Sequence, residues 1–214
     1  MKKIAFSDRY GLTQAVVNLI KTNTRRAEKS LDMLPLEYNP FLTEFQFEYK
    51  DGIIIGRRLF KGSHVETYHL KPRYKIGEVV AVAQRYKDAI NPLDWVNIEI
   101  YKNSPGWTNK MFVVADLMPH RICITDIKLE RIQDISDEDI IREGILQSAD
   151  GFDMFTFDGW VKRCEGKMFP VQIYAEKPRA AFASLIDRIS GRGTWERNPW
   201  VYAYSFELVK EEEQ

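Results

Sequence analysis

The chain has few of the residues that build metal centres and disulfide frameworks. Its 214 residues include two cysteines, Cys123 and Cys164, and three histidines. Two cysteines make at most one bridge, which excludes a disulfide scaffold and fits a reducing compartment better than an oxidising one. His64, His69 and His120 are too scattered for a zinc set. We therefore expect no metal, no other cofactor and no disulfide-linked partner.

Long hydrophobic runs and an excess of charge of one sign are also absent. No stretch approaches the roughly 18 apolar residues that a membrane span requires, and Ser7-Asp8-Arg9 interrupts the N-terminal apolar run too early for a signal peptide. Lysine plus arginine number 31, as do aspartate plus glutamate. This balance excludes a protein that is basic overall, the usual property of a nucleic-acid binder. We expect a cytoplasmic protein without a membrane partner, which meets nucleic acid only through a local basic patch.

The composition that is present is typical of a globular domain. Hydrophobic residues make up 44% of the chain and charged residues 29%, and the length predicts a single domain over residues 1–214. Many short strand-like segments and only three helical ones predict an α+β fold, a small β-barrel with flanking short helices, in place of a doubly wound sheet. No glycine-rich loop precedes the first helix, which disfavours dinucleotide and P-loop folds.

A strand-rich insertion is predicted at residues 31–75. Residues 44–49, 53–60 and 65–70 have strand-like patterns and are separated by the turn signals Lys50-Asp51-Gly52 and Lys61-Gly62-Ser63. They therefore predict a three-stranded β-meander with its own turn chemistry.

The other predicted elements follow from apolar spacing and from capping residues. A capping-box pattern at Ser136 and a glycine at 144 bound one helix, and Pro178 and Gly191 bound another, with Phe182, Leu185, Ile186 and Ile189 on its buried face. The remaining elements are a helix at 11–21, an extended segment at 21–26, a strand buried on both faces at 79–83, a long irregular connection at 91–117, a strand at 121–132 bulged near Thr125, a final strand at 200–209 and a solvated tail at 210–214.

Residues 21–26, Lys-Thr-Asn-Thr-Arg-Arg, form the densest polar signal. In an extended strand, odd and even side chains point to opposite faces, although a tight turn at the end of the preceding helix would bring Lys21 near Thr24. A purely structural alternative is that the cations complement a helix dipole. Glu143 is a second candidate, because a carboxylate in the last turn of a helix opposes the dipole and is unfavourable for stability.

The order of these motifs resembles the ASCH domain family, whose members are relatives of the PUA fold. Phe6-Ser7 before a helix, followed by Ile20 to Arg26, is similar to the family's opening K-T-x-T-R signature. The resemblance covers most of the chain outside 31–70 and 151–176, and it is closest to phage and bacterial ASCH proteins. The other matching segments are 72–80, which resembles the family's P-x-Y-x-x-G-D-x-x strand, 118–124, 135–144 and the closing part from Phe182 to Leu208.

The resemblance implies a PUA-like barrel, RNA binding and a set of site residues. A much smaller bacterial ASCH protein is an amidohydrolase that removes the acetyl group from N4-acetylcytidine, and its lysine, threonine and glutamate correspond to Lys21, Thr24 and Glu143. By this likeness Lys21 is a desolvated base that activates the Thr24 hydroxyl, and Glu143 holds the lysine or moves a proton to the leaving amine. The expected ligand- or RNA-binding residues are Thr22, Arg25, Arg26 and Lys110.

Three functions are compatible with these residues. The first is binding of RNA or a modified nucleoside in a cleft lined by the K-T-x-T-R motif, and the second is amide hydrolysis on an N4-acylated cytidine. The third is an accessory protein of a mobile element that acts through protein contacts of the meander. We favour binding, because the chain departs from the amidohydrolase at Arg26, where that enzyme has an acid, and because it carries the insertion. Its neutral charge favours a nucleoside-sized or short RNA ligand over a duplex.

Overall fold

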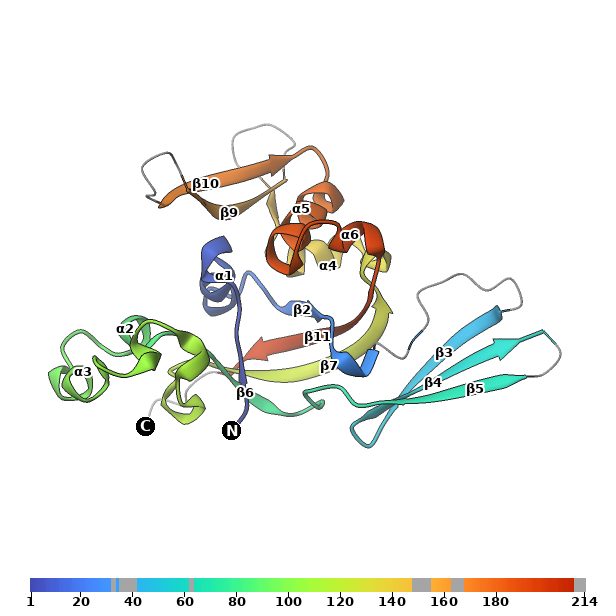
Figure 1. Ribbon diagram of the computed structural model, residues 1–214, viewed down its shortest axis with the longest axis horizontal. Helices are drawn as coiled ribbons and strands as arrows, with labels where there is room; N and C mark the ends of the chain where they lie inside the picture. The colour runs from blue at the N-terminus through green and yellow to red at the C-terminus, as the bar shows by residue number, and fades with distance from the viewer. Residues whose placement is uncertain (32–33, 35–41, 62–63, 148–154, 163–167, 210–214) are drawn as a thin grey trace.

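A five-stranded mixed sheet forms the centre of the molecule. The computed structural model describes residues 1–31, 34, 42–61, 64–147, 155–162 and 168–209. The strand order is β1-β6-β7-β11-β2, with β1 parallel to β6 and the other pairs antiparallel (Figure 1). The strands are β1 (Lys3–Ile4), β2 (Asn23–Arg26), β6 (Val79–Val82), β7 (Arg121–Arg131) and β11 (Trp200–Leu208).

The long strands β7 and β11 carry the predicted bulge. Ser205 is opposite Asp126 and Phe206 is opposite Ile124, so Thr125 is the extra residue. The bulge reverses which parity of residues faces the core, and Ile124 and Ile127 are therefore both buried. The prediction of a bulge near Thr125 is confirmed.

The α+β prediction is confirmed, whereas the closed barrel is not. The edge strands β1 and β2 do not pair with each other in the described part of the chain, so its central sheet is open. β1 has two residues and β2 has four, and the chain between them forms helical turns in place of a strand.

The predicted meander forms a separate antiparallel sheet that extends away from the central one (Figure 1). Asp51 and Gly52 both have positive φ, 52° and 83°, as a two-residue type I′ hairpin turn requires. The second predicted turn, the 31–75 boundary and the tail at 210–214 fall partly or wholly outside the described residues. The strands are β3 (Leu42–Lys50), β4 (Ile53–Phe60) and β5 (Val65–Leu70).

A third sheet has no counterpart in the sequence analysis. It has the order β10-β9-β8 and lies beside α5 and the 3-10 turn at Asp8–Tyr10 (Figure 1). Phe157 fixes it to the core, because this ring is buried and packs edge-on against Tyr10 with centroids 6.1 Å apart. Its strands are β8 (Leu146–Gln147), β9 (Phe155–Lys162) and β10 (Met168–Ala175).

The three predicted helices are present, and three further ones were missed. The Ser136 side chain caps α4 as expected, accepting from the Asp139 amide at 3.1 Å. Ile189 is 42% exposed, so its predicted burial is wrong. The helices are α1 (Leu12–Val17), α2 (Tyr86–Ala89), α3 (Trp95–Tyr101), α4 (Asp137–Arg142), α5 (Pro178–Ser190) and α6 (Thr194–Arg197), and short 3-10 turns lie at Asp8–Tyr10, Lys29–Leu31, Pro105–Trp107, Lys110–Phe112, Ala115–Leu117 and Ile132–Asp134.

The segment 91–117 is more ordered than the irregular connection that was predicted. Asp94 caps α3 by accepting from the Asn97 amide at 3.1 Å. This helix buries none of its side chains, so it has no buried apolar face that hydrophobic periodicity could reveal.

Throughout the ranges that the structure describes, no helix has both the length and the apolar character needed to cross a membrane.

Trp200 is one contact between the central sheet and the meander. The rings of Phe45 and Phe47 lie 5.3 and 5.5 Å from it, and the Arg131 guanidinium lies 4.4 Å above it. The side chain is 9% exposed. Aromatic packing around this residue of β11 therefore helps to hold the meander to the core, to which its buried Ile54 and Leu70 also belong.

We expect Trp200→Ala to lower the free energy of unfolding by about 3–5 kcal/mol, the usual cost of removing a large buried aromatic ring. Trp95→Ala is the matched control, because Trp95 is 75% exposed and should change stability by no more than about 0.5 kcal/mol. Urea denaturation measures both. Equal effects of the two substitutions would contradict the assigned packing role.

Candidate functional site

A tight turn after α1 carries Lys21 into the interior. Leu19 has a φ of 61°, a left-handed conformation that costs a non-glycine residue about 1–2 kcal/mol. The amides of Ile20 and Lys21 both donate to the Ala15 carbonyl at 2.9 Å, and the Thr22 amide donates to the Arg142 carbonyl at 2.9 Å. These bonds fix the start of β2 against the end of α4.

Glu143 ends α4 and meets Lys21 there. The Lys21 ammonium forms a very short ion pair with Oε2 of Glu143 and donates to its backbone carbonyl at 2.8 Å. Gly144 follows with a φ of 98°, which lets the chain turn away from the helix. Lys21 thus offsets the unfavourable position of a carboxylate at a helix C-terminus.

Arg25 holds the same carboxylate from the other side. Its Nη1 donates to Glu143 at 3.2 Å, its Nη2 to Asp139 at 2.9 Å and its Nε to Glu130 at 2.6 Å. The side chain is 0% exposed. Each of its three nitrogen atoms is therefore already bound to a carboxylate, so we assign Arg25 a positioning role in place of the expected ligand contact.

Burial dominates the electrostatics of this cluster. It lowers the pKa of Lys21 below the ordinary value of 10.5, although Glu143 opposes the shift. Burial acts on Arg25 in the same direction, but Glu143 and Glu130 outweigh it, and the pKa of Arg25 is raised. Burial also raises the pKa of Glu130. Of Lys21 and Arg25, Lys21 is the one with a lowered pKa. Its neutral form therefore requires less free energy than that of an ordinary lysine.

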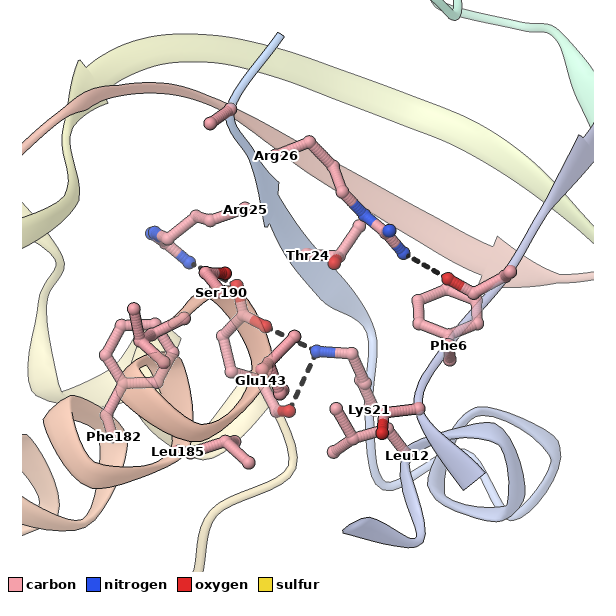
Figure 2. A pocket seen from close by; sticks show the side chains of 15 residues that line it. Phe6, Leu12, Lys21, Thr24, Arg25, Arg26, Glu143, Phe182, Leu185 and Ser190 are labelled. Atoms are coloured by element: carbon pink, nitrogen blue, oxygen red, sulfur yellow. Dashed lines mark hydrogen bonds and ion pairs between the residues drawn. The ribbon is translucent and has the colours of Figure 1, made fainter. Parts of the chain in front are cut away.

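A pocket of about 270 Å³ opens beside this cluster, and we call it the Lys21 pocket. Figure 2 shows Phe6 on one side, α5 on the other and β2 above, with the Lys21–Glu143 pair between them. The pocket therefore has a polar end and an apolar wall. Its polar end consists of Lys21, Thr24, Arg25, Arg26 and Glu143, and its wall consists of Phe182, Leu185, Ile186 and Ile189 of α5.

Thr24 and Arg26 are two polar residues of the pocket with unused hydrogen-bonding capacity. The Thr24 hydroxyl has no hydrogen-bond partner among the described residues, although Thr24 is 5% exposed. Arg26 donates from Nη2 to the Ala5 carbonyl at 2.7 Å and lies 5.3 Å from the centre of the Phe6 ring. Its Nε is buried and unpartnered in the described part of the chain. Both residues line the Lys21 pocket.

The structure brings Lys21, Thr24, Arg25, Arg26 and Glu143 together, but it separates Thr22 and Lys110 from them. Thr22 accepts from Nε of Arg142 at 3.2 Å. The Lys110 ammonium contacts the Phe6 carbonyl, Asp8 at 2.8 Å and Thr13 at 3.2 Å. Neither residue lines the Lys21 pocket, and other protein groups already bind both of them. Their expected ligand contacts are therefore not found there.

The sequence analysis missed the apolar wall and two of the supporting carboxylates. Glu130 and Asp139 gave no signal, because charged residues on a strand and a short helix are usually solvated. The exposed Ile189 lies on the same side of α5 as the core residues Phe182 and Leu185. The apolar face of this helix is therefore longer than the part that the core covers, and that excess was the signal for the wall.

A second cavity of about 280 Å³ is polar and lies apart from the Lys21 pocket. It lies between the start of α1 and the start of α2, next to Asp8 and Arg85. The described residues contain no group of three histidine, cysteine, aspartate or glutamate side chains arranged to hold a metal ion.

Comparison with known proteins adds no relative. No family model, no curated protein and no solved structure matches the chain. The functional argument therefore depends on the geometry of the Lys21 pocket.

We expect the contribution of Lys21 to stability to increase with pH. Its pKa is lower in the folded state than the 10.5 of an ordinary lysine, so below pH 10.5 the unfolded chain binds more protons at this residue. Raising the pH through that window therefore favours the folded state. The test is urea denaturation of the wild-type protein and of Lys21→Met, from neutrality to about pH 10.

The difference in unfolding free energy between the two proteins should move in favour of the wild type as the pH rises. Tyrosines that titrate in the same range are present in both proteins, so the difference isolates Lys21. A difference that does not change with pH, or that moves toward Lys21→Met, would contradict the lowered pKa.

Proposed function

We propose that the Lys21 pocket binds one nucleoside-sized unit, a modified nucleoside or an exposed nucleotide of RNA, and that the chain is an ASCH-like member of the PUA-like superfamily. The observation that carries the binding proposal is the joining of a polar end and an apolar wall in one small cavity. A nucleobase has the same division, with hydrogen-bonding edges around an apolar face. The family proposal depends on the motif order and on the convergence of Lys21, Thr24 and Glu143.

The size of the pocket supports a single nucleoside. Small-molecule sites usually measure about 300–1,000 Å³, so a volume near 270 Å³ is small for such a site. One base and part of its sugar fill this volume, whereas a nucleic-acid duplex is too large to enter it. The chain's zero net charge agrees, because avid binding of long polyanions depends on many uncompensated cations.

The polar groups can recognise a base edge. The Thr24 hydroxyl can donate and accept, and Arg26 has donors that no protein group uses. Phe182, Leu185 and Ile186 offer an apolar surface for the base or for a substituent on it. Recognition would therefore combine a few directed hydrogen bonds with burial of an apolar face.

Amide hydrolysis is a second candidate, favoured by the lowered pKa of Lys21 in the same pocket as the unpartnered Thr24 hydroxyl. In this reaction the Thr24 oxygen attacks the amide carbonyl carbon while its proton passes to Lys21. The C–N bond then breaks, the amine leaves with a proton from Lys21, and water hydrolyses the acyl-threonine ester. Glu143 would hold the lysine in place through its carboxylate and its carbonyl.

Thr24→Val should weaken nucleoside binding by about tenfold or more, since it removes a hydroxyl from the polar end of the pocket while keeping the shape of the side chain. The matched control is Thr22→Val, two residues earlier and outside the Lys21 pocket. Calorimetric titration with cytidine and N4-acetylcytidine measures both variants. Binding that both substitutions weaken equally, or that neither affects, would remove Thr24 from the site.

The same proteins test the second candidate. If the pocket is catalytic, wild type and Thr22→Val release cytidine from N4-acetylcytidine, while Thr24→Val and Lys21→Met do not; chromatography of the products measures this. Full turnover by Thr24→Val would exclude the threonine as nucleophile. If the wild type binds N4-acetylcytidine tightly without turnover, hydrolysis is excluded and binding remains the supported function.

A further inference from the structure

We propose that Arg26 is the oxyanion-binding group of the Lys21 pocket, so that the ligand is a nucleotide held by a phosphate and not a neutral nucleoside. This inference rests on the proposed function and names the ligand class of that site. It depends on how the pocket's cations are paired.

The charges around Lys21 and Arg25 balance without Arg26. Lys21 pairs with Glu143, while Arg25 pairs with Glu130, Asp139 and Glu143. Arg142 adds a third cation, which pairs with Asp139 at 3.2 Å. Three cations therefore face three carboxylates, and this network has no negative charge left for Arg26.

Arg26 has no carboxylate partner within ion-pair distance among the described residues, although it is half-buried. Burial lowers the pKa of Arg26, against the opposing influence of Tyr74, Glu143 and Glu28. The Glu28 carboxylate accepts instead from the Tyr204 hydroxyl at 2.7 Å and from the Arg73 amide at 3.0 Å. Burial raises the pKa of Glu28, although its hydrogen bonds to Tyr204 and Arg73 oppose the shift.

The guanidinium is also poorly hydrogen-bonded. One nitrogen donates to the Ala5 carbonyl, while the buried Nε has no partner in the described part of the structure. A buried donor left without an acceptor is costly, and the cost is larger for a charged group. A phosphate or similar oxyanion supplies the missing acceptor and the missing charge at once.

The surroundings of Arg26 suit a phosphate. Figure 2 shows the side chain extending from β2 toward Phe6, next to Thr24. Ser7 also lines the pocket. It is two residues after Ala5, whose carbonyl accepts from Arg26. The Ser7 side chain makes no capping bond to the turn that it precedes. Its hydroxyl and that of Thr24 are therefore available as further donors to a phosphate oxygen.

Calorimetric titration with cytidine, cytidine 5′-monophosphate and a short oligocytidine tests the inference. The proteins are the wild type, Arg26→Gln, Arg26→Lys and the control Arg142→Gln, whose arginine is outside the pocket. We expect the wild type to bind the monophosphate at least about tenfold more tightly than cytidine. Arg26→Gln should abolish that preference, Arg26→Lys should keep part of it, and Arg142→Gln should keep all of it.

The oligocytidine distinguishes a free nucleotide from a phosphate within RNA. Binding of the oligomer as tight as that of the monophosphate indicates a backbone phosphate, and weaker binding indicates a free nucleotide; either result supports an oxyanion at Arg26. Equal affinity of the wild type for cytidine and its phosphorylated forms would overturn the inference, as would a preference that survives in Arg26→Gln.

Inorganic phosphate separates failure of this inference from failure of the proposed function. If no cytidine compound binds, the proposed nucleoside function is wrong. In that case a rise in melting temperature with phosphate in the wild type, absent in Arg26→Gln, supports the oxyanion site on its own. No rise, or the same rise in both proteins, overturns it.

Discussion

The buried ion pair between Lys21 and Glu143 is the constraint on which the candidate site depends. Lys21 is 2% exposed and Glu143 4%, and a buried charge that loses its partner costs several kcal/mol. The pair therefore fixes the turn after α1 against the end of α4. Arg25 extends the constraint to β7 through Glu130. The Lys21 pocket lies where these elements meet α5, so its polar end is rigid before any ligand arrives.

Adjacent residues of β2 have different roles because side chains alternate along a strand. Arg25 points toward Glu143 and is fully paired, while Arg26 points toward Phe6 and has no carboxylate partner in the described part of the chain (Figure 2). Thr24 lies between Lys21 and these arginines, with a free hydroxyl in the pocket. One short strand thus supplies both the support of the site and the groups that face a ligand.

The sequence was most informative where the signal is local. The Asp51-Gly52 turn, the Ser136 cap and the Thr125 bulge each depend on neighbouring residues, and each is present. Predictions that depend on distant packing did worse: the third sheet was missed, the barrel is not closed in the described residues, and Arg25 turned inward. Lys110 and Thr22 are of the right type for ligand binding, but partners far away in the sequence already bind them.

A double-mutant cycle on Lys21 and Glu143 tests the central role of their ion pair most directly. It compares the unfolding free energies of the wild type, Lys21→Met, Glu143→Gln and the double variant. We predict that Glu143→Gln alone costs about 3–5 kcal/mol, because it leaves Lys21 buried without a carboxylate. The double variant should be less destabilised than the sum of the single variants by about 2 kcal/mol or more. Effects that add to within about 0.5 kcal/mol would show that the pair does not organise the site.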